Sequence, residues 1–310
     1  MYIIILIVIA IVFLISPVFR CLLLNVHKYI VDRLRDIYIY IRYKKYNEAK
    51  QLNQIIFVSH PSVAYGSGKT LMTVKFFYNY YKRYNNKVVY IKDDKGNYVK
   101  KIQKLVAFSN LSINGIPTIP FDSLEMIEEW KDKKEELEKN DSNSIYKLII
   151  LTDELGCVLN SRSFKSNITN SNINAILQQR HLGVTLWVSS SQRFSYVDAL
   201  YRNSIDKALT CRLIGFLDFK KRLLLTEMYL GQDLENATGA IQPKPLKRKC
   251  YFIIDKDYTR YDTTHMIEDL IHKSKTGDLI SDEEYLKSIQ NDNINITVKN
   301  VTKKKKGLFR

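Results

Sequence analysis

Apolar and polar positions divide the chain into a long uncharged segment near its start and an alternation of short apolar runs with mixed segments after it. Residues 3–19 read IIILIVIAIVFLISPVF and carry no charge. An apolar run of this length predicts a transmembrane helix. The alternative, a cleaved signal peptide, requires a basic start and a small-residue cleavage site. Because no Lys or Arg precedes Arg20 and no A-x-A pattern follows, we expect a retained anchor over residues 1–25.

Basic residues gather directly after this run and predict its orientation. They are Arg20, Lys28, Arg33, Arg35, Arg42, Lys44 and Lys45. Positive charge favours the cytoplasmic side, so we expect a single span of the membrane, with the N-terminus outside and the remaining chain in the cytoplasm. Residues 26–50 mix apolar and basic positions and predict a juxtamembrane helix. It either lies along an anionic membrane surface or connects the anchor to the next domain through solvent.

From residue 55 the pattern becomes that of an α/β fold. Apolar runs predict strands at 55–58, 87–91, 146–152, 184–189 and 208–216, and mixed segments predict helices at 70–84 and 122–139. Strands that alternate with helices indicate a mostly parallel sheet covered by helices on both faces. We expect one such domain over residues 51–270, followed by a flexible basic tail over 271–310.

Composition adds a preference for polyanionic partners. The 310 residues include 48 Lys and Arg against 32 Asp and Glu, a formal net charge of +16. A surplus of this size favours nucleic acid or an anionic membrane as a partner. The four cysteines, which are Cys21, Cys157, Cys211 and Cys250, have no paired spacing, so the sequence indicates neither a zinc cluster nor a disulfide framework.

The segment Val63–Thr70 matches the phosphate loop G-x-x-x-x-G-K-[ST], except that Val63 replaces the first glycine. A predicted strand precedes it and a predicted helix follows. Gly66, Ser67 and Gly68 would turn backbone N–H groups toward phosphate oxygens, Lys69 would reach the β- and γ-phosphates, and Thr70 would place a hydroxyl on Mg²⁺. The alternative is a simple Gly-Ser turn, but the flanking elements favour an ATP site.

Two acidic residues follow the apolar run that starts at Tyr146. Asp153 is the candidate Mg²⁺ ligand, and Glu154 is the candidate that orients and polarises the attacking water. The next predicted strand leads to Gln192, which is either a sensor of the γ-phosphate or an ordinary polar strand end.

Three arginines, Arg180, Arg193 and Arg202, are candidates for a finger that acts across a subunit interface, and we select Arg202 among them. The alternative for each is an ordinary surface arginine.

These motifs together resemble the zonula occludens toxin-like (Zot-like) assembly ATPases of filamentous phages, which belong to the DNA-pumping P-loop ATPases. The resemblance covers about residues 55–265. It rests on Gly66–Thr70, Asp153-Glu154, Gln179-Arg180-His181-Leu-Gly183, the strand into Ser191-Gln192, Val197-Asp198 with Arg202, and Tyr261-Asp262-Thr263. The family's membrane span usually follows the ATPase domain, whereas the predicted span here precedes it.

The resemblance implies a homo-oligomeric motor in the host inner membrane. Such a motor would couple hydrolysis of ATP, with Mg²⁺, to the assembly and extrusion of a single-stranded DNA phage, with single-stranded DNA or coat protein as partner. Two alternatives remain at this point. One is a conjugation-type or packaging DNA translocase, and the other is a non-catalytic basic membrane scaffold.

Overall fold

The computed structural model describes residues 2, 4–5, 16–63, 65–93, 95–121, 123–155, 176, 178–215, 221–235 and 243–261. The chain forms two compact units. Unit 1 comprises Met1–Ala49 and Lys87–Ile102, and unit 2 comprises Lys50–Asn86 and Gln103–Arg310. Most of the apolar run 3–19 and all of the predicted tail lie outside the described residues. Among the residues that the structure does describe, no helix is long and apolar enough to cross a membrane.

Unit 1 consists of two helices, a short turn and a ribbon. Its elements are α2 (Pro17–Leu24), α3 (Val26–Arg42), the 3-10 turn η1 (Lys45–Asn47), β2 (Lys87–Lys92) and the first residues of β3 (Tyr98–Ser109). The helix α3 buries none of its residues and ends before Lys44, which adopts a left-handed backbone with φ 45°. The Tyr43 ring stacks on Tyr98 with centroids 3.6 Å apart, which attaches the end of α3 to the ribbon.

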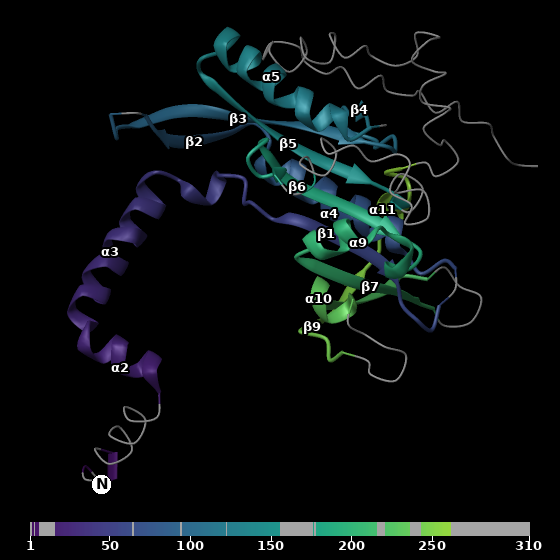
Figure 1. Ribbon diagram of the computed structural model, residues 1–310, viewed down its shortest axis with the longest axis horizontal. Coiled ribbons are helices and arrows are strands. Elements are labelled where there is room, and N and C mark those ends of the chain that lie inside the picture. The colour runs from purple at the N-terminus through teal and green to yellow at the C-terminus, as the bar shows by residue number, and fades with distance from the viewer. Residues whose placement is uncertain are drawn as a thin grey trace, which may run out of the picture. The chain divides into compact units, whose positions relative to one another are not determined.

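Unit 2 is built on a mixed, mostly parallel sheet (Figure 1). Its strands lie in the order β3, β5 (Ser144–Thr152), β6 (Val184–Ser191), β1 (Asn53–Ser59), β7 (Lys207–Ile214), β8 (Leu223–Leu230) and β9 (Lys247–Phe252), and β4 (Ile119–Pro120) pairs with β3. The strand β1 is parallel to β6 and β7, and β5 is parallel to β6, whereas β7, β8 and β9 are antiparallel. The mostly parallel arrangement confirms the prediction from the alternating pattern.

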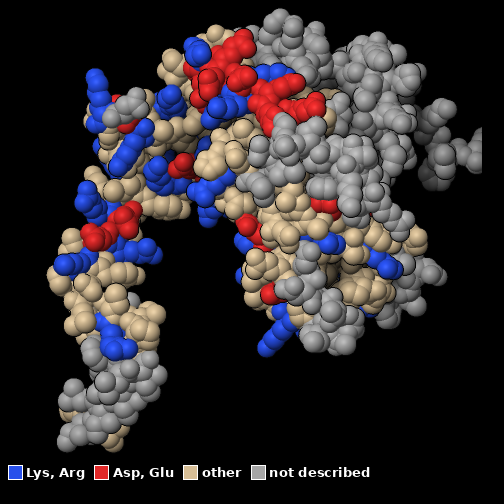
Figure 2. All heavy atoms as spheres, in the orientation of Figure 1, with Lys and Arg blue, Asp and Glu red and all other residues tan. Residues whose placement is uncertain are grey.

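Helices cover both faces of this sheet. They are α4 (Lys69–Tyr84), α5 (Glu125–Asn140), α9 (Ala199–Ser204), α10 (Gly231–Glu235) and α11 (Asp255–Tyr258), with the 3-10 turn η2 (Phe194–Tyr196). The Phe57 side of β1 meets α4, where the Phe57 and Phe76 rings lie 6.0 Å apart. On the other face, Ile56 packs in one core cluster with Trp130 of α5 and Tyr201 of α9. Acidic side chains of α5 lie on the surface of this unit (Figure 2).

Trp187 of β6 fixes the central strands to the helical layer. Its side chain is fully buried, and its indole N–H donates to Thr152 Oγ1 of β5 over 3.1 Å. Its ring meets Phe121 and Tyr201 edge-on at 6.0 and 5.1 Å, a favourable aromatic geometry. The carboxyl ends of β3, β5, β6, β1 and β7 meet at one edge of the sheet, where ligands bind in open α/β folds.

Gly68, the residue before α4, is packed against the β7–β8 hairpin. Its backbone is left-handed with φ +85°, and a Cβ there would lie 2.5 Å from Leu224 Cδ1 and 2.8 Å from Leu213 Cγ. Glycine is required at this position both by the backbone conformation and by the available space.

Gly68→Ala is expected to reduce the free energy of unfolding more than Gly115→Ala. Gly115 has a similar φ of +88°, but its nearest neighbour to an added Cβ is 3.7 Å away. Both changes carry about 1–2 kcal/mol of backbone strain. Overpacking adds about 1–3 kcal/mol at Gly68 alone. Urea denaturation followed by circular dichroism measures the free energy of unfolding of each variant. Equal losses of this free energy in the two variants would contradict the packing argument.

Candidate nucleotide site

The loop between β1 and α4 has the geometry of a phosphate cradle. Gly66 and Gly68 both adopt positive φ, and the Ser67 hydroxyl lies 3.0 Å from the Ser59 hydroxyl, which holds the loop against the end of β1. The residue before α4 is Gly68, which has no side chain to cap the helix, so the first N–H groups of α4 are suited to bind phosphate oxygens. A cavity of about 360 Å³ lies here, lined by residues 65–71 with Gln192, Leu213, Tyr258 and Tyr261.

Asp153 lies at the end of β5 beside this cradle. The Thr70 hydroxyl lies 3.0 Å from each of its carboxylate oxygens, and the Ser190 hydroxyl donates to Oδ1. Burial, together with the negative charge of Glu154, raises the pKa of Asp153, although its contacts with Ser190, Lys69 and Thr70 oppose the rise. A nearby cation would stabilise the ionised form of such a carboxylate, because its charge compensates for the hydration that the carboxylate loses on burial.

Glu154 follows in a left-handed backbone conformation with φ 48°. One of its carboxylate oxygens contacts Lys69 Nζ, and the other accepts a 3.0 Å hydrogen bond from the backbone N–H of Gln192. The Ser190 hydroxyl accepts from the Glu154 N–H over 3.2 Å. The structure thus brings Lys69, Thr70, Asp153, Glu154 and the Gln192 backbone together, from three separate parts of the sequence.

Asn110 is a contributor that the sequence analysis did not single out. Its amide donates to the Asp153 carbonyl and accepts from the Asp153 N–H, both over 2.7 Å. These two bonds fix the peptide that carries the acidic pair. The available signal was a polar residue directly after the apolar run that ends β3, although its partner is 43 residues further along the chain.

The residues present fit a magnesium nucleotide. The described residues contain no cluster of three or more His, Cys, Asp or Glu side chains placed to hold a metal. However, Mg²⁺ at phosphate sites takes one or two protein oxygens, with substrate phosphates and water as its other ligands. Thr70 and Asp153 supply such oxygens, and the uncapped helix end and positive-φ glycines suit phosphate.

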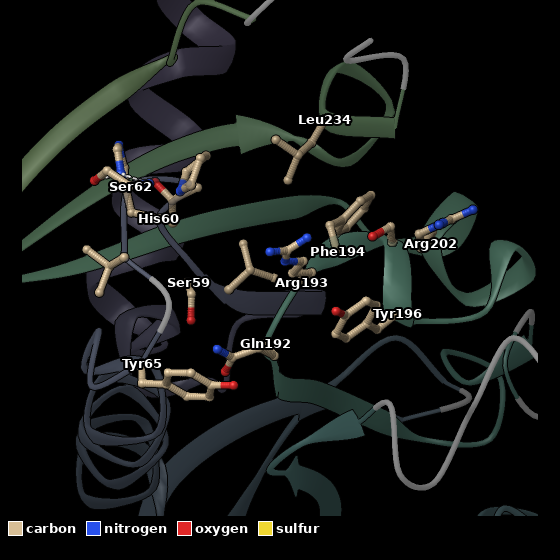
Figure 3. Close-up of a pocket in the computed structure, with 15 residues that line it drawn as sticks. Ser59, His60, Ser62, Tyr65, Gln192, Arg193, Phe194, Tyr196, Arg202 and Leu234 are labelled. Atoms are coloured by element: carbon tan, nitrogen blue, oxygen red, sulfur yellow. Dashed lines mark hydrogen bonds between the residues drawn. The ribbon is translucent and has the colours of Figure 1, made fainter. Parts of the chain in front are cut away.

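A second cavity, of about 690 Å³, adjoins the cradle and shares Tyr65 and Gln192 with it (Figure 3). Arg193 and Arg202 line this second cavity and not the cradle, and the Arg202 guanidinium lies 6.0 Å from the Phe194 ring centroid. Arg180 is exposed in the turn before β6. Within the described chain, therefore, none of the three arginines predicted as finger candidates lines the phosphate cavity, and action across an interface remains a prediction.

Comparison with protein-family models finds no match, and no curated protein matches the chain. Among solved structures, the chain is similar to the N-terminal domain of zonular occludens toxin from Neisseria meningitidis, with a TM-score of 0.40, 19% identity and coverage of 68% of this chain and 98% of that chain. It is also similar to the genome packaging NTPase B204 from Sulfolobus turreted icosahedral virus 2 in complex with ATP-gammaS, with a TM-score of 0.36, 13% identity and coverage of 65% and 98%.

Proposed function

We propose that this protein is a Mg²⁺-dependent ATP hydrolase. One observation carries the proposal: Lys69 and Thr70 at the start of α4 contact Glu154 and Asp153, respectively, at the end of β5. A phosphate cradle with a positive residue, a buried carboxylate for the metal and a second carboxylate for water is the arrangement that phosphoryl transfer to water requires.

Each side chain has a distinct task in this proposal. The loop N–H groups and Lys69 would bind the phosphates, and Thr70 and Asp153 would hold Mg²⁺, which would supply positive charge to offset that of the phosphates. A bound triphosphate competes with Glu154 for Lys69, since both are negative. Glu154, released from Lys69 and still held by the Gln192 N–H, then orients the attacking water.

The finer role that we propose is a homo-oligomeric motor for assembly and extrusion of a filamentous single-stranded DNA phage. The support is the motif resemblance, the predicted anchor and the net charge of +16. A conjugation-type or packaging translocase shares the same site chemistry. Neighbouring genes separate the two, because coat genes indicate assembly and relaxase genes indicate conjugation.

The residue pattern of helix α3 supports the proposal that this helix lies at the membrane surface. Val26, Ile30, Leu34, Ile37 and Ile41 recur every three or four residues, and each side chain is between 42% and 65% exposed. The opposite side of the helix carries Lys28, Asp32 and Arg35. An exposed apolar stripe backed by charged residues with a net positive charge suits the interface of an anionic bilayer.

ATP turnover by the full chain tests the hydrolase proposal. Lys69→Ala is expected to abolish nucleotide binding, because it removes the charge that holds the phosphates. Glu154→Gln should retain binding and lower turnover by about 10²–10⁴-fold. The matched control is Glu125→Gln, at an exposed position of α5, which should leave turnover unchanged.

A folded, oligomeric wild-type chain that binds no nucleotide would refute the hydrolase proposal. The scaffold alternative would then be preferred, and it predicts that Lys69→Ala leaves steeply salt-dependent DNA binding intact.

Asp153→Asn is expected to stabilise the metal-free, nucleotide-free protein at pH 8 while abolishing hydrolysis. Because burial raises the pKa of Asp153 above its unfolded value, the ionised carboxylate destabilises the folded state at pH values above both pKa values. As the pH falls through the raised pKa, the group is protonated and the penalty disappears. The difference in Tm between the variant and the wild type should therefore shrink on acidification.

Thermal unfolding over a pH series without Mg²⁺ measures this difference. Asp132→Asn, at an exposed position of α5, serves as the control and should show little pH-dependent difference. A lower Tm for Asp153→Asn than for the wild type at pH 8 would contradict the prediction.

A fragment comprising residues 16–310, which lacks most of the predicted span, is expected to sediment with anionic vesicles and to remain in the supernatant with zwitterionic ones. Ile37→Glu, in the middle of the α3 stripe, should release it, because a charge there opposes insertion of the stripe. Val99→Glu, at an exposed position of β3, is the control. Sedimentation that is unaffected by Ile37→Glu would refute the role of α3.

A further inference from the structure

The segment 253–261, which we call the strap, runs from the end of β9 across the start of α4 to the loop after β3. It begins at Ile253, whose N–H donates to the Arg222 carbonyl over 2.7 Å. It ends at Tyr261, which forms an antiparallel bridge with Ile113. Between these points it passes α4, so its side chains lie next to the phosphate loop.

A buried ion pair and a cation–π contact hold the strap to α4. Asp257 is 2% exposed and accepts from Lys75 Nζ over 2.6 Å, and it pairs with Arg260 over 2.8 Å. The Arg260 guanidinium lies 4.2 Å from the centroid of the Tyr78 ring, a close cation–π contact. Lys75 and Tyr78 are both residues of α4, so the strap contacts this helix at two positions one turn apart.

Hydrogen bonds from the loop after β3 fix the other end of the strap. The Asn114 side chain donates to the Thr259 carbonyl and its backbone N–H donates to the Arg260 carbonyl, both over 2.7 Å. The Tyr258 hydroxyl donates to the Lys221 carbonyl over 2.6 Å. These bonds fix the backbone of the strap at Thr259 and Arg260 and the ring of Tyr258 through its hydroxyl.

Tyr258 and Tyr261 line the same 360 Å³ cavity as the phosphate loop, together with Leu213. Burial, with the negative charge of Asp153 and the neighbouring Tyr258, raises the pKa of Tyr261 to about 12. Its hydroxyl therefore remains protonated and able to donate at neutral pH. Residues 65–71 and Gln192 form one part of the lining of this cavity, and Leu213 with the rings of Tyr258 and Tyr261 forms the other part.

We propose that the strap forms the nucleoside half of the site, with Tyr258 and Tyr261 binding the base and ribose of a nucleoside triphosphate whose phosphates occupy Gly66–Thr70. Aromatic rings beside an aliphatic side chain suit the flat face of a base, and a protonated tyrosine hydroxyl suits a sugar oxygen. This inference rests on the proposed function, because it assumes that the loop binds phosphates.

Competition binding with the full chain tests the strap, using ATP and inorganic tripolyphosphate as two probes. Tripolyphosphate reports on the phosphate loop alone, because it has no base or ribose. Tyr258→Ala and Tyr261→Ala are each expected to weaken ATP binding about five- to a hundredfold, the range for loss of one stacking ring, and to leave tripolyphosphate binding unchanged. Tyr258→Phe keeps the ring and should retain most of the affinity for ATP.

The controls separate this inference from the proposed function. Tyr196→Ala, at a 51% exposed position that lines only the adjoining cavity, should change neither affinity. Lys69→Ala should lose both probes. If both strap variants keep the wild-type affinity for ATP, or lose ATP and tripolyphosphate equally, the strap is not a nucleoside site. If the wild type binds neither probe, the hydrolase proposal itself is overturned, and the strap inference falls with it.

Discussion

The contact of the Thr70 hydroxyl with the Asp153 carboxylate is the interaction on which the site depends. The two residues are 83 positions apart, and β6 lies in the sheet between β1, which precedes the phosphate loop and Thr70, and β5, which precedes Asp153. Ser190 of β6 holds the acidic pair, because its hydroxyl donates to Asp153 and accepts from the Glu154 N–H. The geometry of the site is therefore a property of the sheet order, and the buried Trp187–Thr152 bond stabilises that order from within.

The burial of Asp153 has opposite effects on the stability of the metal-free fold and on the binding of a cation. A carboxylate placed where burial raises its pKa is unfavourable for the metal-free fold, yet the same burial increases its attraction for a cation. Asn110 and Ser190 limit the conflict by fixing the peptide and one carboxylate oxygen. The strained backbone of Glu154 fits the same pattern, since left-handed residues concentrate at functional positions.

Much of this arrangement could be predicted from the sequence, because its signals are local. The apolar runs that became β1, β5 and β6 are continuous, as buried parallel strands require, and the phosphate loop is a contiguous motif between a strand and a helix. The strands β3, β4, β8 and β9 were not predicted. In β3 and β9, lysines such as Lys100 and Lys249 interrupt the apolar pattern that would indicate a strand.

The parts of the site that could not be predicted are those that depend on distant partners. Asn110 acquires its role only by lying beside Asp153, and Tyr258 only through a segment that crosses α4. Local pattern carries no information on such contacts. The same reason kept Arg193 and Arg202 together as finger candidates, because sequence spacing does not tell which cavity an arginine lines.

The strap also sets an order of events during synthesis of the chain. The phosphate loop and α4 leave the ribosome early, whereas Asp257, which ties the strap to Lys75, emerges only after the last strand of the sheet. Until then Lys75 lacks this buried partner, and the cavity is open where Tyr258 and Tyr261 will lie. A nascent chain can therefore complete its phosphate loop and acidic strand before the segment 253–261 completes the lining of the adjacent cavity. The sheet can thus fold before Tyr258 and Tyr261 are in place beside the phosphate loop.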